Sequence, residues 1–300
     1  MAASPIPNPA ERHRLNLSAG FASIAVASIL VGVKLWAQLK TGSLSVAASM
    51  IDSVLDLMIA AANLAAIRYA ARPADDDHSF GHTAAEDIAA LAQAAIVTVS
   101  ALAIAGGAVM RLIEPAPMRA EGAGMVAMVV SLVLTAGLVA WQTRVARRTG
   151  SRVVRADMAH YLTDFLPMLG AMAALGASRL YGIDWLDPIL ALLAAAFILR
   201  TGLTLGGGAW DGLMDREAPA ATVARIAAIA DGCEGLRGWH DLKTRTSGTK
   251  LFVQIHAEID GTLTLAQAHA VAARLRRAIL DAAPDLGAAE VEVIVHQDPA

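Results

Sequence analysis

The chain has 300 residues, of which 56% are hydrophobic and only 17% charged, and its mean hydropathy is +0.52. These values lie well outside the range of soluble domains, so the composition predicts a membrane protein with several spans. The formal net charge of -3 gives no sign of nucleic-acid binding, and no nucleic-acid motif is present. A single cysteine, Cys233, excludes an intramolecular disulfide and a thiolate cluster within one chain.

Six apolar segments are expected to cross the membrane as helices. Five of them approach the ~20 apolar residues that a span requires. They run over residues 15–37, 44–67, 88–110, 122–142 and 156–178. A sixth segment, at about 185–210, is weaker because its uninterrupted apolar part covers only 189–199 and Arg200 follows. We include it because an even number of spans keeps both termini on one side.

The termini are expected in the cytoplasm. The polar segment 1–14 precedes a span that is too long for a cleaved signal peptide, so the first helix should remain. Lys and Arg residues near the span ends are divided unequally between the two sides, and the richer side is normally cytoplasmic. The terminal side carries Arg12, Arg14, Arg68, Arg72, Arg144, Arg147, Arg148, Arg152 and Arg155, and the opposite side carries Lys40, Arg111, Arg119 and Arg179.

From about Gly212 onward, alternating apolar and polar residues replace the continuous apolar runs. This pattern predicts a helix at 221–230, strands at 236–245 and 251–259 around a Ser247-Gly248 turn, a helix at 265–283 and a strand at 290–296. The order αββαβ is typical of a small open-faced, ferredoxin-like α/β sandwich. We therefore expect an N-terminal tail at 1–14, an all-α six-helix transmembrane domain at 15–211 and an α/β domain at 212–300.

Two predicted spans carry ionisable residues at their centres. Asp52 and Asp56 lie in the second span, and His160 and Asp164 lie in the fifth, each pair four residues apart and so on one helical face. An aspartate at the middle of a span costs roughly 2.5 to 3.5 kcal/mol, so such residues need partners or a function. Three carboxylates and one imidazole form a ligand set for a hard or borderline metal ion.

Other roles for the acidic pair in the second span are less complete. The two aspartates could face a water-filled vestibule or pair with Lys34 or Arg200, but this leaves the residues of the fifth span unexplained. Asp157 lies one turn before His160, and we expect it at the cytoplasmic end of its helix, near Arg152 and Arg155. It is therefore not included among the metal ligands.

Seven of the eight histidines fall in potential ligand clusters. His160 belongs to the membrane set, and His78 and His82 follow Asp75 in the loop between spans two and three. The alternative for these loop residues is an ordinary polar loop whose acidic side chains are solvated. The remaining candidates all lie in the C-terminal domain and comprise His240, His256, His269, His296 and Asp298.

Strand alternation places some of these residues on one face. In the strand 251–259, His256 and Glu258 lie opposite the apolar residues, and in the strand 290–296, His296 and the following Asp298 lie together on the polar face. A single histidine on a strand surface is usually only solvated. Four histidines and an aspartate in one small domain favour a metal site.

These motifs together resemble the cation diffusion facilitator family, and within it the bacterial zinc and ferrous-iron efflux pumps. The resemblance covers nearly the whole chain and is carried by DSVLD, ADDDHSFGH, RADMAHYLTD, LMDR, HDLKTR, VQIHAEI, AQAHAVA and VIVHQDP. It implies a homodimer in the bacterial inner membrane, with six spans in each subunit and a cytoplasmic, metallochaperone-like domain for metal binding and dimerisation. It also implies a secondary transporter, not an enzyme, that exchanges metal for protons.

The resemblance implies three metal sites. The transport site is formed by Asp52, Asp56, His160 and Asp164, and the loop site by Asp75, His78 and His82. The cytoplasmic site is binuclear and formed by His240, His256, His269, His296 and Asp298, with the aspartate bridging two ions. Zn²⁺ is the first expectation for the metal, but the same nitrogen and oxygen ligands also bind Fe²⁺, Cd²⁺, Co²⁺ and Mn²⁺.

One position departs from the family pattern. The bacterial pumps usually place a lysine after the loop histidines, which pairs with an aspartate at the domain junction and locks the dimer. This chain has Ala84 there, so Asp215 lacks that partner unless another cation such as Arg216 replaces it.

Two other functional classes remain open from the residues alone. Asp56 and Asp164 could form the shared-proton dyad of an intramembrane aspartyl protease, although such an enzyme needs no tail histidines. A membrane-anchored metal sensor without transport would explain the tail but not the four residues in the membrane.

Overall fold

The computed structural model describes residues 8–41, 44–114, 122–181, 185–286, 288 and 290–300. The chain divides into two compact units. One unit is His13–Ala209, and the second includes Trp210–Ala300.

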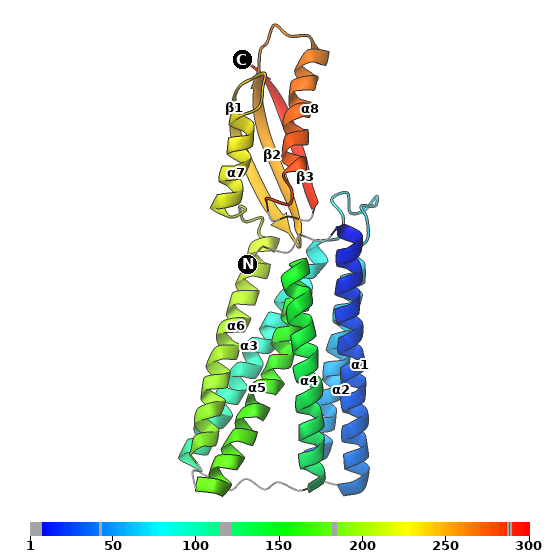
Figure 1. The fold of residues 1–300 in the computed structure, drawn as a ribbon, viewed down its shortest axis with the longest axis vertical. Coiled ribbons are helices and arrows are strands. Elements are labelled where there is room, and N and C mark those ends of the chain that lie inside the picture. Colours follow the sequence, from blue (N-terminus) through cyan, green and yellow to red (C-terminus); the bar gives the residue numbers. More distant parts are fainter. Residues whose placement is uncertain (1–7, 42–43, 115–121, 182–184, 287, 289) are drawn as a thin grey trace. The chain divides into compact units, whose positions relative to one another are not determined.

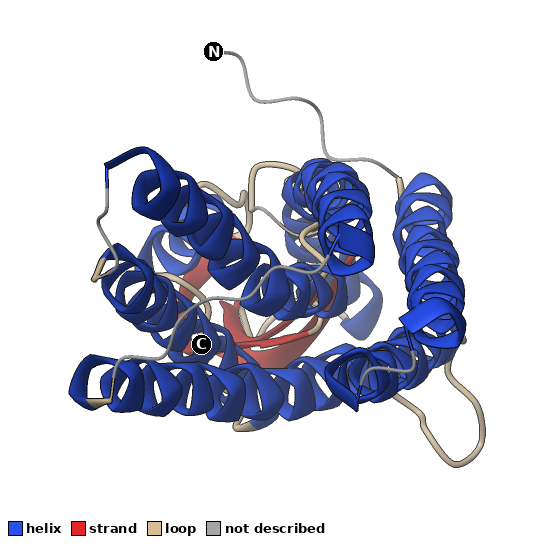
Figure 2. Cartoon of the chain, turned by 90° about the horizontal axis from the view of Figure 1, so that it is seen from below, coloured by secondary structure: helices blue, strands red, loops and turns tan. Residues whose placement is uncertain are grey.

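The first unit is built from helices alone, one for each predicted span (Figures 1 and 2). The six helices are α1 (Pro9–Thr41), α2 (Leu44–Ala70), α3 (Ala84–Ile113), α4 (Gly122–Thr149), α5 (Arg152–Tyr181) and α6 (Leu186–Leu213). Each is 27 to 33 residues long, which exceeds the ~20 residues needed to cross the hydrocarbon core. The prediction of an all-α, six-helix membrane domain is confirmed.

The relative strengths of the last two spans differ from the prediction. Among the described residues, five helices are long and apolar enough to cross a membrane, and these include α6 but not α5. Helix α5 falls short because Asp157, His160 and Asp164 interrupt its apolar sequence, whereas α6 has a mean hydropathy of 2.0 despite Arg200. The segment 156–178, predicted as a strong span, is thus the weaker one by composition.

Helix α5 lies among the other helices of the bundle. Val153 and Val154 pack in a buried cluster with residues of α1, α2 and α4, and Ala159 packs with residues of α3 and α6. Polar residues on such a helix face protein instead of lipid, and this makes them tolerable at membrane depth. The position of α5 therefore explains how it can carry Asp157, His160 and Asp164.

The second unit contains the predicted αββαβ order, which is confirmed. Its elements are α7 (Ala220–Asp231), β1 (Leu236–Ser247), β2 (Lys250–Ile259), α8 (Leu265–Asp281) and β3 (Glu290–Pro299). The sheet order is β1-β2-β3, with β1 antiparallel and β3 parallel to β2. Gly248, with φ of 55°, turns the chain between β1 and β2.

One face of the sheet is apolar and is covered by α7 and α8 (Figure 1). From β2, Val253, Ile255 and Ala257 point into this core, where they meet Ile226 of α7 and Leu275 of α8. Because side chains alternate along a strand, the intervening residues project from the opposite, outer face. That outer face carries the polar residues of β2 and β3, as predicted.

Candidate metal sites

The four membrane residues approach one cavity within the helical unit. Asp56 of α2 and His160 of α5 are in contact, with 3.0 Å between Oδ1 and Nε2. Both side chains are largely buried, with 13% and 8% of their surface exposed. Asp56 also lines a cavity of about 420 Å³ together with Asp52, Asp164 and Lys34. The spacing of four residues within each helix thus brings both pairs to the same place.

The four residues do not form a closed ligand set. In the described part of the chain, they are not among the groups whose ligand atoms all lie within 4.8 Å of one another. Only Asp56 and His160 touch. Three carboxylates at one cavity repel one another, and a cation at its centre would offset this repulsion.

A proline at this cavity frees one backbone carbonyl of α5 from its helical hydrogen bond, a feature that was not predicted. Pro167 lies inside α5 and lines the cavity together with Thr163 and Asp164. Proline has no N–H, so it cannot bond to the carbonyl of the residue four positions earlier, which is Thr163. A proline four residues after a polar residue in a span is the signal that could have indicated it.

Asp157 lies in the second turn of α5, toward the predicted end of this helix, but its expected place beside Arg152 was wrong. Its side chain is buried and accepts three hydrogen bonds, from Ser23 of α1 (2.5 Å), Asn63 of α2 (2.8 Å) and Gln142 of α4 (2.6 Å). Arg152 instead pairs with Asp87 of α3. Because neutral donors occupy both carboxylate oxygens, this buried aspartate network joins four helices and is not arranged as a metal site.

The loop residues Asp75, His78 and His82 form a compact group, which we call the loop cluster. Asp75 Oδ1 lies 3.2 Å from His78 Nδ1, and its Oδ2 lies 3.3 Å from His82 Nε2. His82 Nδ1 contacts the carbonyl of Pro73 at 3.1 Å, which leaves Nε2 directed at the aspartate. Desolvation raises the pKa of Asp75, but hydrogen bonds from the backbone and ring of His78 outweigh it and hold that pKa below its usual value.

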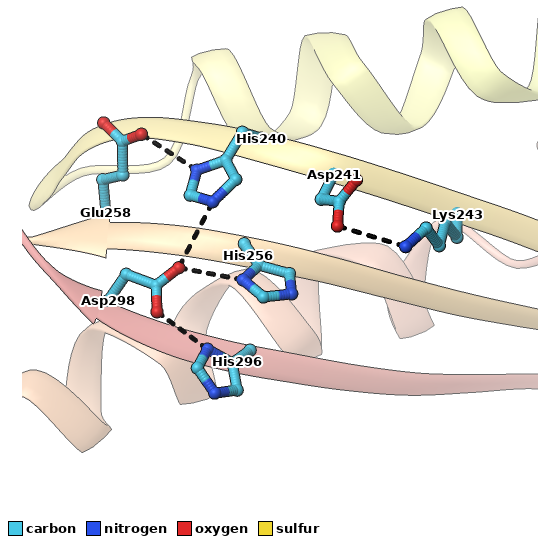
Figure 3. Close-up of polar contacts among 7 residues, drawn as sticks. All are labelled: His240, Asp241, Lys243, His256, Glu258, His296 and Asp298. Carbon is cyan, nitrogen blue, oxygen red and sulfur yellow. Dashed lines mark hydrogen bonds and ion pairs between the residues drawn. The ribbon is translucent and has the colours of Figure 1, made fainter.

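A second group lies on the outer face of the C-terminal sheet (Figure 3). Asp298 Oδ2 is 2.9 Å from His256 Nδ1 and 3.4 Å from His240 Nε2, and its Oδ1 is 2.8 Å from His296 Nδ1. We call these four residues the tail cluster. The hydrogen bond from His256, assisted by that from His296, lowers the pKa of Asp298. Both carboxylate oxygens of Asp298 thus accept hydrogen bonds from histidines.

His269 is not brought to the tail cluster within one chain. It is exposed on α8, and α8 packs against the opposite, apolar face of the sheet through Val271 and Leu275. A layer of the domain therefore separates this histidine from the tail cluster. Glu258, in contrast, contacts His240 at 2.9 Å but was not predicted as a site residue. Its position on the polar face, two residues after His256, was the available signal.

Asp215 has a different partner from the one considered. Arg216 pairs with Asp211, whereas Asp215 accepts a hydrogen bond of 2.9 Å from Arg245 Nη1. The Arg245 guanidinium also lies over the Phe252 ring, 4.2 Å from its centroid. Within one chain the cation beside Asp215 is therefore Arg245 of β1.

Comparisons with known proteins cover both units. The cation efflux transmembrane domain matches residues 20–214, and the cytoplasmic domain of cation efflux proteins matches residues 218–300. Similar proteins include the cation-efflux pump FieF of Klebsiella pneumoniae, which is 40% identical over 286 residues. The pumps of the same name from Shigella flexneri and Escherichia coli are 41% identical over the same length. In each case the match covers 95% of this chain and 93% of the relative.

Proposed function

Because the chain belongs to the cation efflux family, we propose that this multi-pass membrane protein exports a divalent metal cation in exchange for protons. The observation that carries this proposal is the contact between Asp56 and His160 at the wall of a cavity that Asp52 and Asp164 also line. Two helices thus supply carboxylates to one cavity, and the imidazole of His160 contacts one of them. Such ligands suit a borderline dication.

The same ligands account for exchange with protons. Carboxylates and imidazole bind metal only when deprotonated, so metal and protons compete for the cavity. In an inward-open state, the site loads metal and releases protons, and in an outward-open state, protonation favours release of the metal. Lys34 adds positive charge to the same cavity and helps to keep metal binding reversible.

The loop and tail clusters are proposed as additional metal sites, of which the second is regulatory. Both lie outside the predicted spans and present histidines with a shared carboxylate. Metal in the tail cluster would shift the protein toward the tail arrangement that binds metal better. We further propose a homodimer in the bacterial inner membrane with both termini in the cytoplasm. His269, which faces away from the tail cluster of its own chain, would have to act from a second subunit.

The alternatives have less support. In a protease dyad the carboxylates of Asp56 and Asp164 share a proton, but Asp56 contacts an imidazole, and the similar proteins are efflux pumps. A sensor without transport leaves the cavity and its carboxylates without a role. Zn²⁺ remains the first candidate as substrate, with Fe²⁺, Cd²⁺, Co²⁺ and Mn²⁺ as the others.

Metal flux into proteoliposomes with an imposed pH gradient tests the proposal. Asp56→Ala and His160→Ala should each reduce flux to background while the protein still folds. Asp187→Ala is a matched control, because Asp187 is as buried as Asp56 (10% against 13% of the side chain exposed) but pairs with Arg111 away from the cavity. Wild-type flux in Asp56→Ala, or equal loss in Asp187→Ala, would contradict the site.

A further inference from the structure

The strand register arranges the outer face of the C-terminal sheet in two parallel rows. One row is His240, His256 and His296, and the row beside it is Gly238, Glu258 and Asp298. Each member of the second row lies two residues from a histidine on the same strand, and therefore on the same face. The row of histidines thus has two carboxylates beside it, and only Asp298 belongs to the tail cluster.

The imidazole of His240 lies between these two carboxylates (Figure 3). Its Nδ1 is 2.9 Å from Glu258 Oε1, and its Nε2 is 3.4 Å from Asp298 Oδ2. Two ligand atoms of a tetrahedral zinc ion, each bonded at 2.0–2.1 Å, lie about 3.3 Å from one another. The distance between His240 Nε2 and Asp298 Oδ2 is close to this value. His240 Nε2 is therefore placed to share a metal ion with Asp298, while Nδ1 contacts the carboxylate of Glu258.

A glycine makes room for this arrangement. A Cβ atom at Gly238 would lie 2.5 Å from Glu258 Oε2, which is closer than a real Cβ atom comes to another heavy atom, and 3.3 Å from its Cδ, which is a tight contact. The missing side chain at 238 lets the Glu258 carboxylate turn toward β1 and reach His240. The contact between Glu258 and His240 thus depends on the Glu258 carboxylate and also on the absence of a side chain at Gly238.

We propose that Glu258 is a positioning residue of the tail metal site, which accepts the Nδ1–H of His240 and so leaves Nε2 free to bind a divalent cation. A histidine that donates one ring N–H to a carboxylate keeps its lone pair on the other nitrogen, and its ring orientation is fixed. This inference rests on the proposed function of the tail cluster. It assigns to Glu258 a role that acts through His240 and not through contact with the metal.

Zinc affinity of the full-length protein tests the proposal. In a background of Asp56→Ala and His78→Ala, which weakens the other two proposed sites, Zn²⁺ is titrated in competition with a chromophoric chelator. Glu258→Ala and Gly238→Ala should each weaken the remaining site by about 10- to 100-fold, the usual effect of losing such a partner. Glu290→Ala removes an equal charge from β3, where it pairs with Lys250, and should change affinity less than twofold.

A tautomer measurement separates positioning from a general structural effect. Ring-nitrogen NMR of the metal-free protein, with the His240 signal assigned by its loss in His240→Ala, should show protonated Nδ1 in the wild type. In Glu258→Ala the proton should move partly or wholly to Nε2. An unchanged tautomer, or unchanged zinc affinity in both Glu258→Ala and Gly238→Ala, overturns the proposal.

The failure of the tail site itself gives a different result. If His256→Ala leaves zinc affinity unchanged in the same background, the tail cluster binds no metal and the inference falls with it. If His256→Ala removes binding but Glu258→Ala does not affect it, the tail site stands and only the role of Glu258 is overturned. Melting temperatures of the metal-free variants, which should stay close to that of the wild type, check that each protein is folded.

Discussion

Replacement of Asp157 by alanine should destabilise the helical unit more than the loss of one hydrogen bond. The carboxylate accepts bonds from Ser23, Asn63 and Gln142, which are themselves almost fully buried. Asp157→Ala therefore removes the common acceptor of three donors on three other helices, while Ser23 Oγ keeps the carbonyl of Ala19 at 3.1 Å and Gln142 Nε2 keeps Ser23 Oγ at 2.8 Å. The loss is shared by four helices, so it should appear in global unfolding and not only in local fraying.

The loss in the free energy of unfolding for Asp157→Ala can be estimated from two values for the cost of a lost hydrogen bond. A buried donor left unsatisfied costs about 1–3 kcal/mol in soluble proteins, whereas interhelical hydrogen bonds in a membrane protein average about 0.6 kcal/mol. Three donors at the lower value give about 2 kcal/mol. Water entering the space of the lost carboxylate would offset much of the higher value. We expect a loss of about 2–4 kcal/mol in the free energy of unfolding.

Unfolding in mixed detergent micelles measures this loss, with Asn63→Ala as the companion variant. Asn63→Ala removes one donor and should cost roughly 0.6–1 kcal/mol in hydrogen bonding. The double variant should lose less than the sum of the single variants, because the Asn63 to Asp157 bond can be lost only once. A loss below about 0.5 kcal/mol for Asp157→Ala, or strict additivity with Asn63→Ala, would refute the reasoning.

Four further predictions concern the metal sites and the C-terminal domain. Asp52→His should shift flux toward Zn²⁺ relative to Cd²⁺ or Fe²⁺, because imidazole is the softer ligand, and an unchanged flux ratio places selectivity elsewhere. In the Asp56→Ala, His78→Ala background, zinc at ~100 times the Kd of the tail site should stabilise the protein by about 2.7 kcal/mol, and adding His296→Ala with Asp298→Ala should remove this gain in thermal unfolding. The same two tail substitutions without that background should leave flux measurable. Because the pKa of Asp298 is lowered in the folded protein, the stability due to its ionised form is complete above about pH 4 and is lost as the pH falls through the lowered pKa. The melting temperatures of metal-free wild type and Asp298→Asn should therefore converge below pH 4, and a constant difference down to pH 3 would contradict the lowered pKa. Arg245→Ala should lower the melting temperature more than Arg216→Ala, because only Arg245 both pairs with Asp215 and lies over an aromatic ring; equal effects would argue against this contact.

The C-terminal fold could be predicted because its pattern is local. Alternation along β2 and β3 assigns each side chain to a face, and Gly248 indicates the turn between β1 and β2, which the structure places at Gly248 and Thr249, one residue later than predicted. The pairs in the membrane could be predicted for a similar reason, since a spacing of four residues determines a helical face wherever the helix lies. Both predictions use only the residue pattern within a single helix or strand.

The remaining features depend on contacts between elements. The partners of Asp157 come from three helices distant in the sequence, so proximity to Arg152 was a poor guide. The strength of α5 as a span was overestimated because Asp157, His160 and Asp164 lower its hydropathy. That these residues are sheltered by neighbouring helices becomes visible only from the contacts of α5. His269 was grouped with the other histidines by residue type, but the sheet lies between them.

The spacing of the tail histidines comes from the backbone of the sheet. Neighbouring strands lie about 4.8 Å apart, and the ring centroids of His240 and His256 and of His256 and His296 are separated by 5.0 and 4.5 Å. The backbone hydrogen bonds between the strands set this spacing, and substitutions of nearby side chains change it little. In the proposed tail site, the distance between neighbouring histidine ligands is thereby tied to the strand spacing of a β-sheet. Substitutions on this face should therefore change the identity of the ligand atoms more easily than the distance between the ligand positions.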